Sequence, residues 1–250
     1  MDIQVLISTT NPDPKDFYNL NFDKLIISQN DRGIVEENEL IKFLSFDEKG
    51  LSKSRNRAIQ ESSADIGLIA DDDLIYFEDF EAKIKNAFEK FPDADILTFK
   101  ITTPDGKPYK KYSDSPFKHS RTSIYKVSSV EMVLKLSSIK SAGVAFDERF
   151  GLGATYSSGE ETIFLNDALD AGLNLYFFPE PIVIHPIESS GKILDENFFY
   201  SKGALIRRLY SGTLNIIIGI IFLIKQITKK QNTLTLTASL KSIIKGLRSL

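Results

Sequence analysis

Three consecutive aspartates, Asp71-Asp72-Asp73, follow the apolar run Ile66–Ala70. A short apolar run of this kind predicts a buried parallel strand, and ligands of open α/β sheets bind beyond the carboxyl ends of such strands. Three carboxylates packed there repel one another unless a cation neutralises them. Hard oxygen ligands favour Mg²⁺ or Mn²⁺, and such ions link carboxylates to substrate phosphates. For an isolated triplet, an acidic turn after a strand is the alternative.

The segment before this strand has the features of an anion-binding helix start. Ser52 is a candidate N-cap, and a helix is expected over Ser52–Ser62. Its first turns carry Lys53, Arg55 and Arg57, beside free N–H groups and the positive end of the helix dipole. Together with carboxylates after the next strand, this helix suits a metal-bound nucleotide diphosphate.

From Gly50 to Asp73 the chain resembles the family 2 glycosyltransferases of GT-A fold. Their pattern runs from a Gly through Ser/Ala-Arg-Asn, a helix and a strand to Asp-x-Asp. The resemblance implies an α/β fold with a mixed, mostly parallel, Rossmann-like sheet flanked by helices. It also implies metal-dependent, inverting transfer of a sugar from a nucleotide-diphosphate donor, preferably a uridine diphosphate sugar. The acceptor would be a hydroxyl of a glycan or lipid-linked oligosaccharide in bacterial surface polysaccharide synthesis, of capsule or exopolysaccharide type.

The resemblance also assigns donor and metal contacts. Asp71 and Asp73 would hold Mn²⁺ or Mg²⁺ against the diphosphate, with Asp72 near the ribose or the metal. His185 follows an expected strand and is a candidate third metal ligand or phosphate donor, although a buried structural histidine is the alternative. The other candidate donor-binding residues lie at strand ends and on the basic helix: Thr9, Asp31, Arg55 and Asn56. For Asp31, an exposed turn aspartate is the alternative.

A second block of the sequence carries the expected catalytic base. Phe146-Asp147-Glu148 and Gly159-Glu160-Glu161 resemble the family's Phe-Asp-Glu turn and the Gly-Glu-Asp that opens a helix. Glu161 stands where the family usually has Asp, and it would remove the proton from the acceptor hydroxyl. Glu160 would orient the acceptor or raise the pKa of Glu161 by like-charge repulsion. Which glutamate is the base stays open, and acids in a first helical turn also complement the helix dipole.

Length and composition allow one α/β domain with an appendage. The chain has 250 residues, of which 42% are apolar and 26% charged, as in ordinary globular proteins. It has no cysteine, which excludes disulfides and thiolate metal sites. The start, Met1–Ile7, lacks the basic region of a signal peptide, so we expect a cytoplasmic catalytic site. We assign residues 1–199 to the catalytic domain and 200–250 to a C-terminal helical extension.

The extension is strongly basic. It holds nine of the 31 basic residues and no acid, which leaves a net charge of −12 in residues 1–199. Its apolar run Leu214–Ile224 falls short of the roughly 20 residues that span a bilayer. Leu240–Leu250 has the apolar stripe and basic flanks of an interfacial amphipathic helix. We expect peripheral attachment to the anionic inner face of the plasma membrane; packing on the domain or dimerisation is the alternative. A partner nucleic acid is not expected, because the extension has few aromatic residues.

Two other functions compete with sugar transfer. A phosphoryl or nucleotidyl transferase would also use paired carboxylates and a metal ion, although the chain has no Gly-x-x-x-x-Gly-Lys-Ser/Thr phosphate-binding motif. A catalytically weak or inert membrane-peripheral protein of the same fold is the non-enzymatic alternative. The identity of the sugar, the acceptor, the linkage and the oligomeric state are not determined by these patterns.

Overall fold

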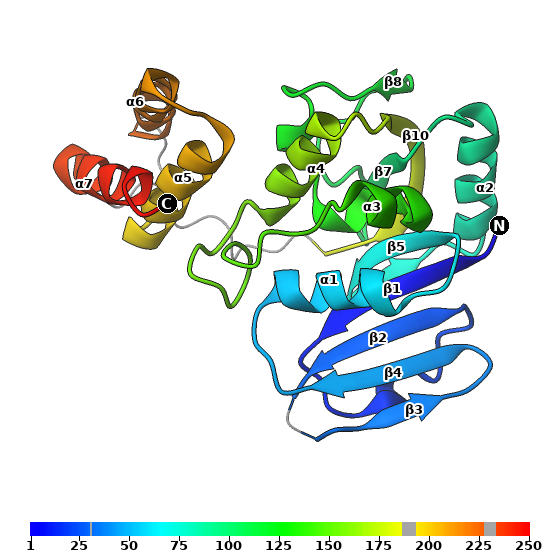
Figure 1. Cartoon of the computed structure of the whole chain (residues 1–250). Helices are drawn as coiled ribbons and strands as arrows, with labels where there is room; N and C mark the ends of the chain where they lie inside the picture. Colours follow the sequence, from blue (N-terminus) through cyan, green and yellow to red (C-terminus); the bar gives the residue numbers. More distant parts are fainter. Residues whose placement is uncertain (31, 187–193, 228–233) are drawn as a thin grey trace. The chain divides into compact units, whose positions relative to one another are not determined.

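The fold is built on a ten-stranded mixed sheet (Figure 1), seen in a computed structural model that describes residues 1–30, 32–186, 194–227 and 234–250. The strands are β1 (Ile3–Thr9), β2 (Lys24–Gln29), β3 (Val35–Glu37), β4 (Ile41–Phe46), β5 (Ile66–Asp71), β6 (Ile75–Tyr76), β7 (Ile96–Thr102), β8 (Phe117–Lys118), β9 (Met132–Lys135) and β10 (Leu175–Ile184). Their order is β3-β4-β2-β1-β5-β9-β7-β10-β6, with β8 paired to β10. The pairs of β1 with β2 and β5, of β2 with β4 and of β7 with β10 are parallel.

Helices pack on both faces of this sheet (Figure 1). Buried side chains of α1 (Leu51–Glu61), α3 (Leu136–Ala142) and α4 (Glu160–Asp170) form one core with the sheet. The other core contains α2 (Phe80–Lys90) and the 3₁₀ helix η1 (Pro14–Phe17). The central strands are covered on both sides, which explains why they read as continuous apolar runs. The expected mixed α/β architecture is therefore present.

Two features of the sheet differ from the sequence-based expectation. Leu175–Phe178 and Ile182–Ile184 are two short apolar runs separated by two prolines, which predicts two strands, but they are the two ends of the single strand β10. The register against β7 shifts around Pro181, because proline has no N–H group to give to the ladder. The short strand β3 was not predicted, because its side chains are largely exposed and show no apolar pattern.

The chain divides into two compact units. The first consists of residues 1–49, 53–146 and 164–187, and it contains the whole sheet. The second consists of residues 50–52, 147–163 and 188–250. The predicted boundary at residue 199 therefore differs from the observed division, because residues 147–163, which include the acid pair, group with the C-terminal helices.

The second unit contains three helices, α5 (Glu196–Leu209), α6 (Thr213–Ile227) and α7 (Leu236–Leu247). Two glycines bring α5 and α7 into backbone contact. A Cβ added to Gly246 would lie 2.1 Å from the carbonyl oxygen of Tyr200, and one on Gly203 would lie 2.3 Å from that of Ile243. The side chain of Ile243 is buried in the core shared by the three helices. Part of the stripe predicted to face a membrane thus packs inside the protein, as the alternative reading allowed.

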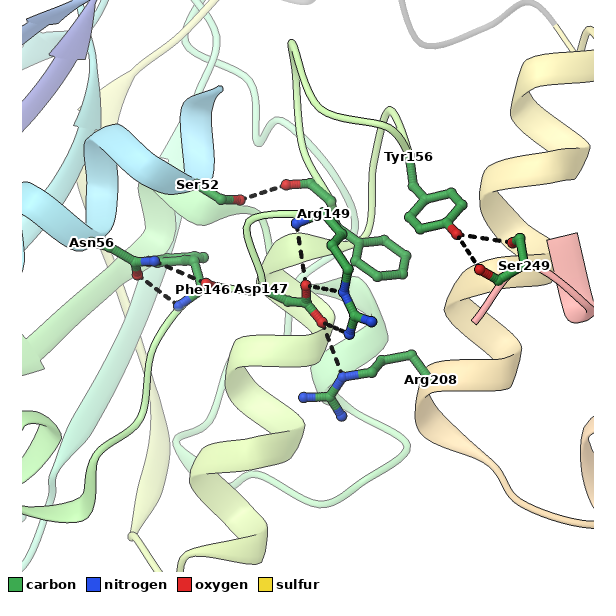
Figure 2. Close-up of polar contacts among 9 residues, drawn as sticks. Ser52, Asn56, Phe146, Asp147, Arg149, Tyr156, Arg208 and Ser249 are labelled. Carbon is green, nitrogen blue, oxygen red and sulfur yellow. Dashed lines mark hydrogen bonds and ion pairs between the residues drawn. The ribbon is translucent and has the colours of Figure 1, made fainter. Parts of the chain in front are cut away.

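Polar contacts tie residues 147–163 to these helices (Figure 2). The Asp147 carboxylate accepts hydrogen bonds from Arg149 (2.6 Å) and from Arg208 on α5 (3.1 Å). The Tyr156 hydroxyl donates to Ser249 Oγ at 2.9 Å, just after α7. Ser52, expected as an N-cap, instead donates its hydroxyl proton to the carbonyl oxygen of Phe150 at 2.6 Å. The C-terminal segment is therefore a structural part of this unit.

No helix in the described ranges is both long and apolar enough to cross a bilayer.

The glycine contact predicts a large difference between two alanine variants. We expect Gly246→Ala to lower the free energy of unfolding by about 1–3 kcal/mol, because the methyl group cannot fit between α5 and α7. Gly219→Ala on α6 is the matched control, since its Cβ would have only ordinary contacts at 3.4 Å or more and alanine favours helices. Urea unfolding of both variants tests this expectation. Equal stability of the two would show that the α5–α7 contact does not depend on these glycines.

Candidate functional site

The aspartate triplet lies at the carboxyl end of β5, in the middle of the sheet. Asp71 is the last residue of β5 and pairs in register with Ser8 of the parallel strand β1. This register places Thr9, the next residue of β1, beside the triplet. The Thr9 hydroxyl donates a hydrogen bond to the Asp72 carboxylate and accepts one from the backbone N–H of Asn11 at 2.9 Å. Two of the predicted donor-binding residues, Thr9 and Asp72, are therefore brought together.

The buried side chain of Arg55 fixes the carboxylate of Asp71, the first aspartate of the triplet. The Arg55 side chain lies on α1 and is only 1% exposed. Its guanidinium donates hydrogen bonds to Asp71 Oδ1 at 2.9 Å and to Ser129 Oγ at 2.8 Å. Ser129 begins the 3₁₀ helix η3 (Ser129–Glu131), which leads into β9. Because a buried guanidinium needs partners, this pair fixes the position of the Asp71 carboxylate.

The third aspartate faces the predicted histidine. After the triplet the chain returns as β6, which pairs with the end of β10, and His185 is the next residue after β10. His185 Nδ1 lies 2.5 Å from the carbonyl oxygen of Pro186, and Nε2 lies 3.7 Å from Asp73 Oδ1. A carbonyl oxygen can only accept, so Nδ1 carries a hydrogen. In the neutral ring, the lone pair of Nε2 is therefore available on the side of Asp73.

This arrangement fits a divalent cation. A metal-binding histidine usually donates its other N–H to a carbonyl or carboxylate, as Nδ1 of His185 does here. Two atoms that bind one ion at about 2.1 Å each lie at most about 4.2 Å apart, and Asp73 Oδ1 and His185 Nε2 meet that condition at 3.7 Å. No group of three or more His, Cys, Asp or Glu side chains suited to a metal occurs within the described ranges. Phosphate oxygens and water would have to complete the coordination, as is common for Mg²⁺.

Tyr76 belongs to this site and was missed in the sequence. Its hydroxyl is buried and has no hydrogen-bond partner among the residues that the structure describes. Burial, with the charges of Asp71 and Asp73, raises its pKa well above the usual value. The hydroxyl therefore stays protonated and can donate a hydrogen bond to a ligand. Only its position three residues after the triplet could have indicated it, since the pairing of β6 with β10 decides where it lies.

One predicted donor-binding residue, Asn56, uses its side chain elsewhere. Asn56 uses its side-chain amide on the backbone of Phe146: Nδ2 donates to the carbonyl oxygen at 2.9 Å, and Oδ1 accepts from the N–H at 2.8 Å (Figure 2). It thus holds the residue that precedes Asp147, and its contact with a donor stays a prediction. Asp31 lies outside the described residues.

The acid pair opens α4, in the second unit. Gly159, the residue before it, has a φ of +109°, which favours glycine. Glu160 is buried with its carboxyl packed against Gly151, whereas Glu161 is only partly buried. Lys202 of α5 is a further ionisable neighbour that the sequence did not reveal. Burial lowers the pKa of Lys202, and the charges of Glu161 and Glu160 oppose that shift. The pair is therefore accompanied by a lysine from the C-terminal extension.

Comparison with known proteins agrees with this geometry. Residues 28–137 match the family described as Glycosyl transferase family 2. No curated protein sequence matches the chain.

The solved structures of S. aureus TarS 1-349 are similar to this fold. The structure described as S. aureus TarS 1-349 aligns with 99% of this chain and 71% of its own, at 13% identity and a TM-score of 0.57. The complex with UDP-GlcNAc aligns with 99% of this chain and 72% of its own, at 14% identity and a TM-score of 0.59. The complex with UDP has a TM-score of 0.58 at 13% identity, and covers 99% of this chain and 71% of its own. At such low identity the likeness concerns the fold.

Proposed function

We propose that this chain, whose residues 28–137 match the family described as Glycosyl transferase family 2 and whose fold is similar to that of TarS 1-349, transfers a sugar from a uridine diphosphate donor to an acceptor hydroxyl with inversion at the anomeric carbon. The observation that carries the proposal is the set of residues around the triplet: Thr9, Arg55, Asp71, Asp72, Asp73, Tyr76 and His185. Three carboxylates, one buried arginine and one histidine are the groups that a metal-bound diphosphate requires.

The nature of the donor is supported by the structural neighbours. TarS 1-349 was solved with UDP and with UDP-GlcNAc. We therefore propose a uridine diphosphate sugar for this chain, and UDP-GlcNAc is the first donor to test. Thr9 and Asp72 at the end of β1 and β5 would contact the nucleoside side of the donor. For the acceptor we propose a glycan or lipid-linked oligosaccharide of bacterial surface polysaccharide.

We propose that Asp73 and His185 hold Mn²⁺ or Mg²⁺, and that Asp71, the other predicted ligand, would have to turn from Arg55 to reach the same ion. A bound cation would neutralise the negative charge that builds up on the diphosphate as the bond to the sugar breaks. Arg55 keeps Asp71 in place, and the buried Tyr76 hydroxyl, whose pKa is raised by burial and by the charges of Asp71 and Asp73, stays protonated. The 3.7 Å separation of His185 Nε2 from Asp73 Oδ1, with Nδ1 held by the carbonyl oxygen of Pro186, supports the cation because both atoms can lie within coordination distance of one ion.

We propose Glu161 as the catalytic base and Glu160 as a positioning residue. A hydroxyl is a poor nucleophile at neutral pH, so a carboxylate must take its proton as the oxygen attacks the anomeric carbon. The electron pair of the breaking C–O bond leaves with the uridine diphosphate. The more exposed glutamate suits this role, and burial of Glu160 against Gly151 suits a structural one. Lys202 would balance the charge of the pair.

The metal proposal predicts the behaviour of two variants. We expect EDTA to stop the release of UDP from UDP-GlcNAc, and added Mn²⁺ to restore it. In isothermal titration with Mn²⁺ and UDP together, Asp73→Ala and His185→Ala should each bind Mn²⁺ about tenfold or more weakly. Asp114→Ala, which removes a fully exposed carboxylate, is the control. Full activity in EDTA, or unchanged Mn²⁺ affinity of both site variants, would exclude the proposed metal site.

The base proposal predicts a loss in turnover without a loss in donor affinity. Glu161→Gln keeps the shape of the side chain and removes the proton acceptor, so we expect kcat to fall by about 10²–10⁴-fold. The Kd for UDP should stay within about twofold. Glu160→Gln is the matched control, with a smaller effect on kcat. A large fall in kcat for Glu160→Gln and a small one for Glu161→Gln would make Glu160 the base. Normal turnover of both variants would show that the two glutamates have a structural role only.

The surface of α6 supports membrane attachment. Its side chains Leu214, Ile216, Ile217, Ile220, Ile221 and Ile224 are between 49% and 62% exposed. Asn215 and Gln226 of the same helix are buried instead. This inverts the usual pattern of a helix on a water-soluble protein, and an exposed apolar patch of this size marks an interaction site.

We propose that this isoleucine face of α6 lies in an anionic bilayer surface, on the inner face of the plasma membrane. The helix has 15 residues, so it is about 22 Å long and too short to span about 30 Å of hydrocarbon. The extension's nine basic residues, without any acid, favour anionic lipid. In this proposal the apolar contact with the bilayer is made by α6 and not by the Leu240–Leu250 segment, because Ile243 of that segment is buried.

Vesicle sedimentation tests this attachment. We expect Ile221→Ser/Ile224→Ser to reduce binding to phosphatidylglycerol vesicles about tenfold, because less apolar area is buried. The control Val35→Ser/Leu40→Ser changes two exposed apolar residues of the sheet edge and should bind as the unaltered protein does. Salt should weaken binding only in part. The proposal would be wrong if the full-length protein stayed in solution at low salt. If it also formed an oligomer that the α6 variant disrupts, the isoleucine face would be a self-association surface.

A further inference from the structure

A cavity of about 570 Å³ in the first unit has no place in the mechanism above. Its wall is formed by Thr98 of β7, Phe177 of β10 and side chains of the long segment 103–131. A volume in this range suits one or two sugar rings or a small organic ligand. A connecting segment this long, with only short elements of its own, commonly has a binding role.

The rim of the cavity is positively charged. Segment 103–131 has six basic and three acidic residues, although residues 1–199 as a whole carry a net charge of −12. Lys111 and Lys126 line the cavity with exposed side chains. Neither ammonium group forms an ion pair with a carboxylate in the part of the chain that the structure describes. These two cations are therefore available to an anionic ligand.

The buried charge inside the cavity is already balanced. Glu131 is 2% exposed, and its carboxylate accepts hydrogen bonds from Lys110 at 2.9 Å and from the Tyr112 hydroxyl at 2.6 Å. Burial, with the charge of Lys110, lowers the pKa of His119 to about 4, so its ring is neutral at pH 7. That ring is held by Thr98 Oγ1 at 2.7 Å. The net charge open to a ligand thus comes from Lys111 and Lys126.

Aromatic rings form the apolar part of the wall. Phe117 is 37% exposed, and its ring centre lies 5.1 Å from that of Phe177. Tyr112 stacks on the same Phe177 ring with an angle of 3° between the planes. An exposed aromatic face next to hydroxyl and imidazole groups suits the apolar face and the hydroxyl groups of a sugar ring.

We propose that this cavity binds a sugar ring that carries an anionic group, with the ring against Phe117 and the anion at Lys111 and Lys126. The class includes sugars with a carboxylate and sugars with a phosphate group, because both present oxygens to ammonium groups. The site is separate from the aspartate triplet, whose negative charge repels the same ligand when no cation is bound. It would hold a charged unit of a glycan, and its binding does not depend on sugar transfer.

Titration followed by NMR, at low salt and without divalent cations, tests the proposal with three probes. Glucuronic acid and glucose 6-phosphate separate the two anionic groups, and glucose is the neutral control. We expect at least one anionic probe to bind, with glucose about tenfold weaker. Lys111→Ala/Lys126→Ala should raise the Kd of that probe about tenfold, since each exposed charged contact contributes modestly. Phe117→Ala should weaken it as well, and salt should reduce the binding.

The matched control is Lys85→Ala/Lys90→Ala, which removes the same charge from exposed positions on α2. It should bind the probes as the unaltered protein does. Equal loss in both double variants would show a general charge effect and overturn the assignment. Failure of both anionic probes to bind, or unchanged binding by Lys111→Ala/Lys126→Ala, would overturn it too. Because no donor or metal is present, these outcomes are independent of whether the transferase proposal holds.

Discussion

The contact between Arg55 and Asp71 organises the centre of the first unit. Burial of the Arg55 side chain, which is 1% exposed, would destabilise the fold if its guanidinium had no partners. The guanidinium donates hydrogen bonds to Asp71, the last residue of β5, and to Ser129 before β9. It joins the consecutive elements α1 and β5 to η3, which lies 74 residues after Arg55 in the chain. The first carboxylate of the triplet is thereby held at the edge of the core, whereas Asp72 contacts Thr9 and Asp73 faces His185. Each aspartate has a different neighbour, which is why one short motif can serve several contacts.

The second unit shows that the acid pair depends on the C-terminal extension. Residues 147–163 are held by Arg208 of α5 and by Ser249 after α7 (Figure 2). Hydrogen bonds from Arg149 and Arg208 overcome the effect of burial and keep the pKa of Asp147 below its usual value. The backbone contact at Gly203 and Gly246 then fixes α7 against α5. The extension therefore supports the segment that carries Glu160 and Glu161, and it supplies Lys202 beside them.

The two charged surfaces of the protein have different chemistry. The extension combines exposed isoleucines on α6 with basic residues, which suits a lipid surface. Segment 103–131 combines exposed lysines with aromatic rings around a cavity, which suits a sugar with an anionic group. Both stand out because residues 1–199 are acidic as a whole. These two surfaces are therefore the basis of the two separate binding proposals, one for an anionic bilayer and one for an anionic sugar.

The amino-acid sequence alone predicts the fold class, the order of the central strands along the chain and the position of the triplet at the end of Ile66–Ala70. Apolar runs and motif spacing are local signals, so they can be recognised without knowing which strands pair with each other. Tertiary structure alone decided the contacts of Tyr76, Lys202 and Asn56, since these depend on which strands and helices meet. The same holds for α6 and α7: both segments are apolar in sequence. Only the close approach at Gly246 decides that Ile243 is buried while the isoleucines of α6 remain exposed.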